Sequence, residues 1–181
     1  LAYVNDRLQV EPELALSWTP SDDLKAWDIQ LREGVAFHNG RDMTADDVVS
    51  SFAFHKAKTS FARQIDRVEK TGPHKVRMHL GKPNSEFPFI LGEYQLMIMP
   101  AAPIETIGLD GIGTGPYRIV DLDPKRRLVM ERNERYWRKG LPYVDRFEVA
   151  SSPGRMESAL NGFRGGQFDA VAADHLFGRA A

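Results

Sequence analysis

The chain contains no cysteine, which excludes disulfides, thiol catalysis and cysteine-ligated zinc. It has no excess of either charge, because 24 Lys and Arg stand against 25 Asp and Glu, for a formal net charge of −1. The charges are interspersed, so neither a basic face for nucleic acid nor a polybasic membrane patch is indicated. No apolar run approaches the ~20 residues of a transmembrane helix. What remains is a globular protein of 181 residues, enough to bury a core in one or two subdomains.

The clearest local pattern is a strand followed by a turn. Residues 27–32 alternate apolar and polar side chains, which predicts a strand with one buried face. Asn39 and Gly40 then predict a tight turn, because glycine tolerates a positive φ and the asparagine side chain can bond to nearby backbone. We expect His38, in the same turn, to make a positional hydrogen bond.

A helix is predicted directly after this turn. Thr44 stands where an N-cap should, and Asp46 and Asp47 fall in the first helical turn, where carboxylates meet the positive end of the helix dipole. The inward face of this helix is predicted to carry three apolar residues: Val48, Val49 and Phe52.

Periodicity and turn residues predict the remaining elements. Closely spaced glycines and a proline between residues 101 and 115 predict a loop, where we place a boundary between two subdomains. Before this loop we predict a strand over 75–80, a short helix over 86–91 and a fully buried strand over 96–99. After it we predict strands over 117–121, 127–132 and 144–150, a helix over 156–163 closed by Gly165 and Gly166, and an apolar run over 168–173.

Several segments together resemble one protein family. They are PELALSW at 12–18, LREGVAFHNGRDMTADDVVSSF at 31–52, GTGPY at 113–117, ERNERYW at 131–137 and GQFD at 166–169. In order and approximate spacing they are similar to the family 5 solute-binding proteins of bacterial ABC importers, the oligopeptide, dipeptide and nickel-binding type. The family's proteins are much longer than this chain.

The resemblance implies an α/β (mixed α+β) fold, specifically an incomplete periplasmic binding protein type II-like lobe with a mixed sheet and flanking helices. Residues 1–105 would form an N-terminal subdomain of the first lobe, and residues 106–181 would start the main sheet of that lobe. The second lobe would be absent. A single lobe presents half a cleft, so we expect this chain to bind family ligands very weakly if at all.

The resemblance also implies a function in transport. The chain would be part of a substrate-binding protein that captures a peptide or other small solute between two lobes and delivers it to ABC permease subunits. It would act in the periplasm or elsewhere outside the cytoplasm, with membrane contact only through the permease or a lipid anchor outside this chain. We expect any secretion signal to lie upstream of Leu1. Two alternatives stay open: a ligand-sensing domain of a transcription regulator with the same fold, and an extracytoplasmic hydrolase.

One segment stands out as a candidate for ligand contact, because an acid, an aromatic ring and an amide precede an apolar run. The alternative is that its tyrosine and methionine fill the core. In the glycine-rich bend at residues 111–116, the resemblance suggests that an exposed hydroxyl could also contact ligand. The tentative ligand-binding residues are Glu93, Tyr94, Gln95, Leu96, Met97 and Thr114.

Other chemistry has little support in the sequence. The bend at residues 111–116 lacks the G-x-G-x-x-G spacing of a nucleotide-binding loop, and Pro116 has no amide N–H for phosphate. The five histidines show neither H-x-x-x-H nor H-x-H spacing, so we expect no metal site. Neither G-x-S-x-G nor H-E-x-x-H occurs. We therefore predict no cofactor and no enzymatic activity.

Overall fold

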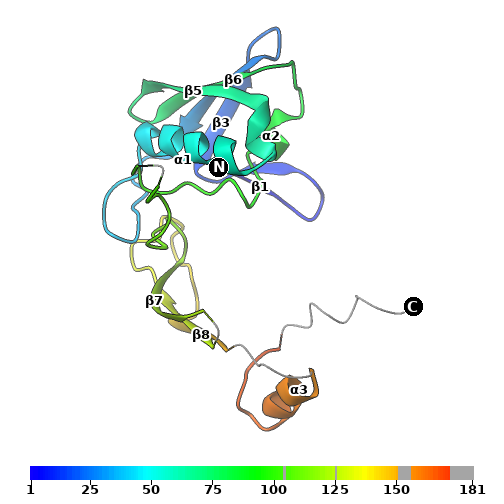
Figure 1. Cartoon of the computed structure of the whole chain (residues 1–181), viewed down its shortest axis with the longest axis vertical. Helices are drawn as coiled ribbons and strands as arrows, with labels where there is room; N and C mark the ends of the chain where they lie inside the picture. The colour runs from blue at the N-terminus through cyan, green and yellow to red at the C-terminus, as the bar shows by residue number, and fades with distance from the viewer. Residues whose placement is uncertain (104, 125, 151–155, 172–181) are drawn as a thin grey trace, which may run out of the picture.

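The computed structural model describes residues 1–103, 105–124, 126–150 and 156–171. Figure 1 shows two bodies arranged one beneath the other, with α3 beyond the second. The first contains β1 (Ala2–Val4), β2 (Val10–Pro12), β3 (Ala15–Pro20), β4 (Ala26–Leu31), α1 (Ala45–Lys58), the 3-10 helix η1 (Phe61–Gln64), β5 (Ile65–Gly72), β6 (Lys75–Leu80) and α2 (Phe87–Ile90). The second contains β7 (Tyr117–Asp123), β8 (Arg127–Arg132) and β9 (Arg146–Ala150), and the chain continues to α3 (Met156–Arg164).

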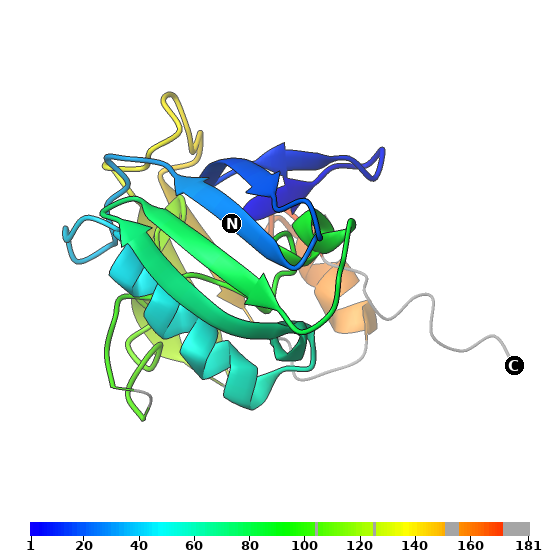
Figure 2. The ribbon, with the colours of Figure 1, turned by 90° about the horizontal axis from the view of Figure 1, so that it is seen from above.

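A four-stranded sheet with the order β3-β4-β6-β5 forms the first body, and all its neighbouring strands are antiparallel. Helix α1 connects β4 to β5, which run in the same direction, but β6 lies between them, so no parallel pair forms. Figure 2 shows α1 lying along the sheet beside β5. The predicted mixed sheet is therefore wrong for the described residues, because β6 returns through a tight turn and inserts between the two strands.

The core lies between this sheet and α1. Alternate residues of β4 and β6 point into it, which confirms the alternation that predicted both strands. Val48 and Phe52 of α1 are buried against them, and Val49 is partly buried at the margin. The strand residues in the core are Trp27, Ile29, Leu31, Val76, Met78 and Leu80.

The start of α1 confirms the predicted turn and cap. Gly40 has a φ of +86°, and the Arg41 N–H donates to Asn39 Oδ1 at 3.1 Å. The Thr44 N–H donates to the carboxylate of Asp47 at 2.8 Å, so a first-turn acid closes the helix N-terminus. The helix therefore begins where the sequence places it.

The second sheet has the order β7-β8-β9 and is also antiparallel throughout. Its three predicted strands are confirmed, with small differences at their ends. Ion pairs lie on one face, including Arg118–Glu131 at 2.9 Å and Arg127–Asp121 at 2.5 Å. The cross-strand register places six apolar side chains on the opposite face: Ile119, Leu122, Leu128, Met130, Phe147 and Val149.

The predicted last helix is confirmed as α3, which ends at Arg164. Gly166, two residues later, has a φ of +72°. Of the apolar run predicted over residues 168–173, residues 168–171 form no strand, and residues 172 and 173 lie outside the described part. Among the described residues, no helix has the length and apolar character needed to cross a membrane.

Candidate functional site

The segment predicted to contact ligand follows α2 and divides between surface and core. Tyr94 is 78% exposed and Met97 is 66% exposed, whereas Leu96 is 1% exposed and belongs to the core cluster. Gln95 is exposed, and Glu93 is partly exposed. The segment therefore presents a ring and a thioether to solvent and is anchored by the leucine between them.

A chain of hydrogen bonds holds the exposed ring. The Thr59 hydroxyl, just beyond α1, donates to Gln95 Oε1 at 3.1 Å, and Gln95 Nε2 donates to the Tyr94 hydroxyl at 3.2 Å. These bonds link the phenol to the end of α1. An exposed aromatic ring that is already oriented loses less freedom when a ligand packs on it.

The strand predicted over residues 96–99 is wrong, because the described structure contains no strand there. The backbone instead runs along α1 and bonds to its side chains. His55 Nε2 donates to the Met97 carbonyl at 2.7 Å. Ser51 Oγ accepts from the Met99 N–H at 2.9 Å and donates to the Met99 carbonyl at 3.2 Å.

Asp47 completes this arrangement by accepting a hydrogen bond from the Ala101 N–H at 2.7 Å. Four residues of a helix span about 6 Å along its axis, and two residues of an extended chain span about 6.6 Å. Side chains at every fourth position of α1 can therefore bind the backbone of every second residue of the segment. We call Asp47, Ser51 and His55 the α1 ladder. Its side chains make the hydrogen bonds to the backbone of residues 97, 99 and 101 that a neighbouring strand would make in a sheet.

Sequence reasoning missed the α1 ladder, although a signal for it exists. Its three members recur at every fourth position, interleaved with Val48 and Phe52 on the inward face of α1. Polar side chains at that spacing on a buried face predict partners in the core, because an unpaired buried polar group is costly.

Asp47 has a larger role than the helix-start charge predicted for it. Its side chain is fully buried and pairs with both terminal nitrogens of Arg41, in addition to its bonds with Thr44 and Ala101. The neighbouring Asp46 forms an exposed ion pair with Lys70 at 2.7 Å. Two adjacent acids therefore differ sharply in environment.

His55 is 4% exposed, and its ring packs edge-on against Phe52 and Phe54, with centroid distances of 6.1 and 5.6 Å. Burial lowers the pKa of His55 below its ordinary value of 6.5, and the hydrogen bond to the Met97 carbonyl opposes the shift only in part. Burial therefore favours the neutral form of the His55 ring.

Thr114 lies elsewhere, in the bend that joins the two bodies. His38 fixes this bend, since its Nδ1 accepts from the Gly113 N–H at 3.3 Å and its Nε2 donates to the Gly115 carbonyl at 3.0 Å. Asn133 Nδ2 donates to the same carbonyl at 3.0 Å. The positional hydrogen bond predicted for His38 is confirmed. Thr114 lies between Gly113 and Gly115, the two residues that His38 binds, and is half-buried.

Two open cavities border the second sheet. The smaller, of about 240 Å³, is mainly apolar and includes Tyr117, Tyr136 and Tyr143. The larger, of about 520 Å³, lies between the His38 turn and the charged side of the sheet. Its residues are His38, Arg118, Glu131, Arg132, Asn133, Glu134, Arg135, Asp145 and Arg146. Neither cavity is lined by the Tyr94 segment or by Thr114.

The other histidines are dispersed. His79 pairs with Glu69 at 3.2 Å on the exposed side of β6, and His74 lies in the turn before that strand. His175 falls outside the described residues. Within the described ranges, no three His, Asp or Glu side chains are grouped in a way that could hold a metal ion.

Comparison with known proteins places this arrangement in context. Residues 9–176 match the model of the bacterial extracellular solute-binding proteins, family 5. The chain is 35% identical over 166 residues to YhjP of Bacillus subtilis, an uncharacterised protein, with 89% of this chain and 27% of the relative covered. It is 31% identical over 176 residues to heme-binding protein A of Haemophilus influenzae, with 80% of this chain and 32% of the relative covered.

Solved structures show the same relationship. The oligopeptide-binding protein AppA from Bacillus subtilis, solved in complex with a nonapeptide, superposes with a TM-score of 0.82 at 26% identity. The alignment covers 93% of this chain and 36% of AppA. The chain thus spans about a third of the length of these relatives.

Proposed function

Because the chain belongs to the family 5 bacterial extracellular solute-binding proteins, we propose that it forms part of the substrate-binding component of an ABC importer. Family 5 proteins bind solutes and are not enzymes. The match over residues 9–176 is the observation that carries this proposal. The work of such a protein is reversible capture and delivery, with no covalent step.

The proposed place of the chain is the first lobe of a two-lobed protein. Residues 1–105 and 106–181 would be its two subdomains. The contacts from His38 to Gly113 and Gly115, and from Arg135 Nη1 to the Gly40 carbonyl at 3.0 Å, support a fixed joint between them. A solute that touched this lobe and a second one would favour the closed form by its differential affinity, and the permease would respond to that closure.

The proposed solute is a peptide or another small molecule with an apolar group. The relatives named above bind heme in one case and a nonapeptide in another, so membership of the family leaves the solute open. The exposed Tyr94 ring and Met97 thioether support an apolar contact, since such groups offer a large surface with some adaptability. Glu93, Gln95 and Thr114 are proposed to add polar contacts, and Leu96 to support the segment from the core.

The place of action is proposed to be outside the cytoplasm, in the periplasm or at the outer face of the cell. The support is the extracellular assignment of the family as a whole. ABC permease subunits are the proposed macromolecular partner, again from membership of the family alone.

Binding by the 181-residue chain provides the test. Peptides of three to five residues should bind only at millimolar concentration, because a single lobe offers contacts on one side. In 15N-labelled protein, the amides of residues 93–97 should shift on titration. Tyr94→Ala should abolish those shifts, and Tyr143→Ala is a matched control, because Tyr143 is 87% exposed but lies on the second body.

Two outcomes would contradict the proposal. Low-micromolar calorimetric binding would mean that the chain contains a complete site of its own. Peptide-induced shifts that spare residues 93–97 and are unchanged in Tyr94→Ala would place any ligand contact elsewhere.

A further inference from the structure

We propose that Ser51 and His55 are positioning residues for the Tyr94–Met97 surface, and that this surface keeps its arrangement only while the His55 ring is neutral. The meaning of this inference for binding rests on the proposed function. The coupling itself is a property of the described chain and can be tested without any ligand.

The hydrogen bonds from α1 fix the register of the segment. In an extended chain, successive side chains point to opposite sides. The α1 ladder binds the backbone of residues 97, 99 and 101, and in this register Leu96 and Ile98 are buried while Met97 is exposed. A slip by one residue would reverse that pattern and turn Met97 inward. The ladder therefore selects which side chains reach the surface.

Ser51 and His55 differ in whether they can gain a proton near neutral pH. The Ser51 hydroxyl does not titrate near neutral pH, whereas an imidazole does. His55 also lies nearest to the exposed residues, since it binds the Met97 carbonyl directly. A change at His55 would act first on the part of the segment proposed to contact ligand.

The His55 ring lies in largely apolar surroundings. Phe52 and Phe54 flank it, and its pKa is lowered by burial, with the Met97 carbonyl as the opposing influence. A proton added to this ring must either remain poorly solvated or draw the ring towards water. Five charged side chains on the elements around it are at least partly exposed: Lys56 and Lys58 of α1, Arg63 of η1, Asp66 of β5 and Glu93 of the segment. Asp47, two turns earlier in α1, is buried and paired with Arg41.

The burial and the hydrogen bond of His55 predict the direction of the pH response. Well above pH 6.5 the ring is neutral in folded and unfolded chains, so the segment is held. As the pH falls below 6.5 towards the lower folded pKa, protonation favours conformations in which the ring has left its buried position. The bond to the Met97 carbonyl is then lost, and the Tyr94–Met97 surface loosens.

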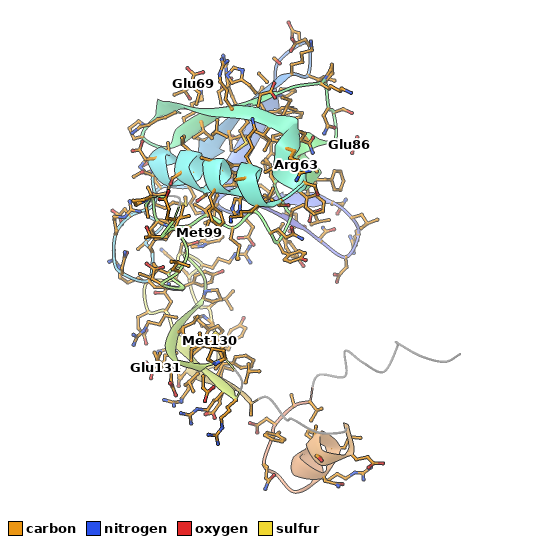
Figure 3. All side chains as sticks on the ribbon, viewed as in Figure 1. Arg63, Glu69, Glu86, Met99, Met130 and Glu131 are labelled. Carbon is orange, nitrogen blue, oxygen red and sulfur yellow. The ribbon has the colours of Figure 1, made fainter. Side chains whose placement is uncertain are left out.

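Methionine methyl NMR of the whole chain gives a direct test. Met97 and Met99 report on the segment, and Met130 in β8 is an internal control on the other body; Figure 3 labels Met99 and Met130. On acidification, the Met97 and Met99 methyl signals should shift or broaden with the midpoint of the His55 ring signal, at a pH below 6.5. The Met130 signal should not follow that midpoint.

Two variants sharpen the test. His55→Gln retains a side-chain donor but cannot titrate, so the transition of the Met97 and Met99 signals should be lost. His79→Gln removes a partly exposed histidine on β6 and should leave the transition unchanged.

The inference is overturned if His55 titrates while the Met97 and Met99 signals stay constant, or if the transition persists in His55→Gln. The wild-type titration alone decides the first point, so the test does not depend on the variant folding. A negative result here would leave the peptide-binding proposal untouched, because no peptide is present.

Discussion

The four-stranded sheet and the three-stranded sheet of this protein are built from similar strands but differ in what covers them. In the first sheet, alternate residues of β4 and β6 are buried beneath α1. In the second, Leu122 is 55% exposed and Phe147 is 46% exposed, although the register places both on one apolar face. No described element packs closely against that face. Alternation thus predicts that a strand has two unlike faces, but the covering element decides whether the apolar face becomes core.

The largest effect should come from the residue that ties α1 to its surroundings. Asp47→Ala would leave Arg41 and the N–H groups of Thr44 and Ala101 without their buried partner. Arg41 is 44% exposed and can be rehydrated, but a hydrogen bond from a backbone N–H to a carboxylate contributes about 1.5 kcal/mol or more, so the loss of two costs about 3 kcal/mol. Urea unfolding should show that loss, whereas Asp46→Ala, which breaks an exposed pair, should change the free energy of unfolding by less than about 1 kcal/mol. Equal effects would remove the distinction between the two acids.

A leucine in each sheet tests the comparison most directly. Leu31→Ala in β4 should lower the free energy of unfolding by about 3 kcal/mol, because Leu31 is fully buried and a cavity would remain. Leu122→Ala in β7 should cost less than about 1 kcal/mol, because that side chain is already largely in water. A comparable loss at Leu122 in the same denaturation experiment would mean that the second apolar face is covered in solution.

A smaller, pH-dependent effect is expected at His55. Between its lowered folded pKa and the unfolded value of 6.5, the unfolded chain binds more protons, so the free energy of unfolding rises with pH in this window. The contribution is complete above pH 6.5 and is lost as the pH falls. Urea midpoints measured at several pH values should show this slope in the wild type and a reduced slope in His55→Gln. An unchanged slope in the variant would assign the effect to other groups.

The smallest effect on stability is expected from Phe147→Lys on the apolar face of the second sheet. The urea midpoint should change little, since Phe147 is about half exposed, but binding of the dye ANS should fall as the apolar patch is interrupted. Glu148→Gln, on the charged face of β9, should leave dye binding as it is in the wild type. A large loss of stability in Phe147→Lys would show that this face is part of a core.

The candidate site divides in the same way as the fold. Local sequence predicted the turn at Asn39 and Gly40 and the cap at Thr44, because both depend on residues close together in the chain. It also predicted that His38, in the same turn, makes a positional hydrogen bond. It predicted the burial of Leu96 but not the exposure of Met97, since the apolar residues 96–99 fit a fully buried strand equally well. Nor did it separate Thr114 from that segment, because only the path of the chain through both bodies sets that distance.

The sequence by itself determined the positions of α1, α3 and the strands β4, β6, β7, β8 and β9, since alternation, helical spacing and turn residues act over a few neighbouring positions. It did not predict β1, β2, β3 or β5. Its motifs were also enough to identify the family. Only the tertiary structure decided that β6 lies between β4 and β5, and that residues 97–101 bind to α1 rather than to another strand. Both outcomes depend on pairing between segments distant in the chain, and alternative pairings satisfy the same local pattern. Whether an apolar face is covered is a property of the whole assembly, which local sequence does not specify.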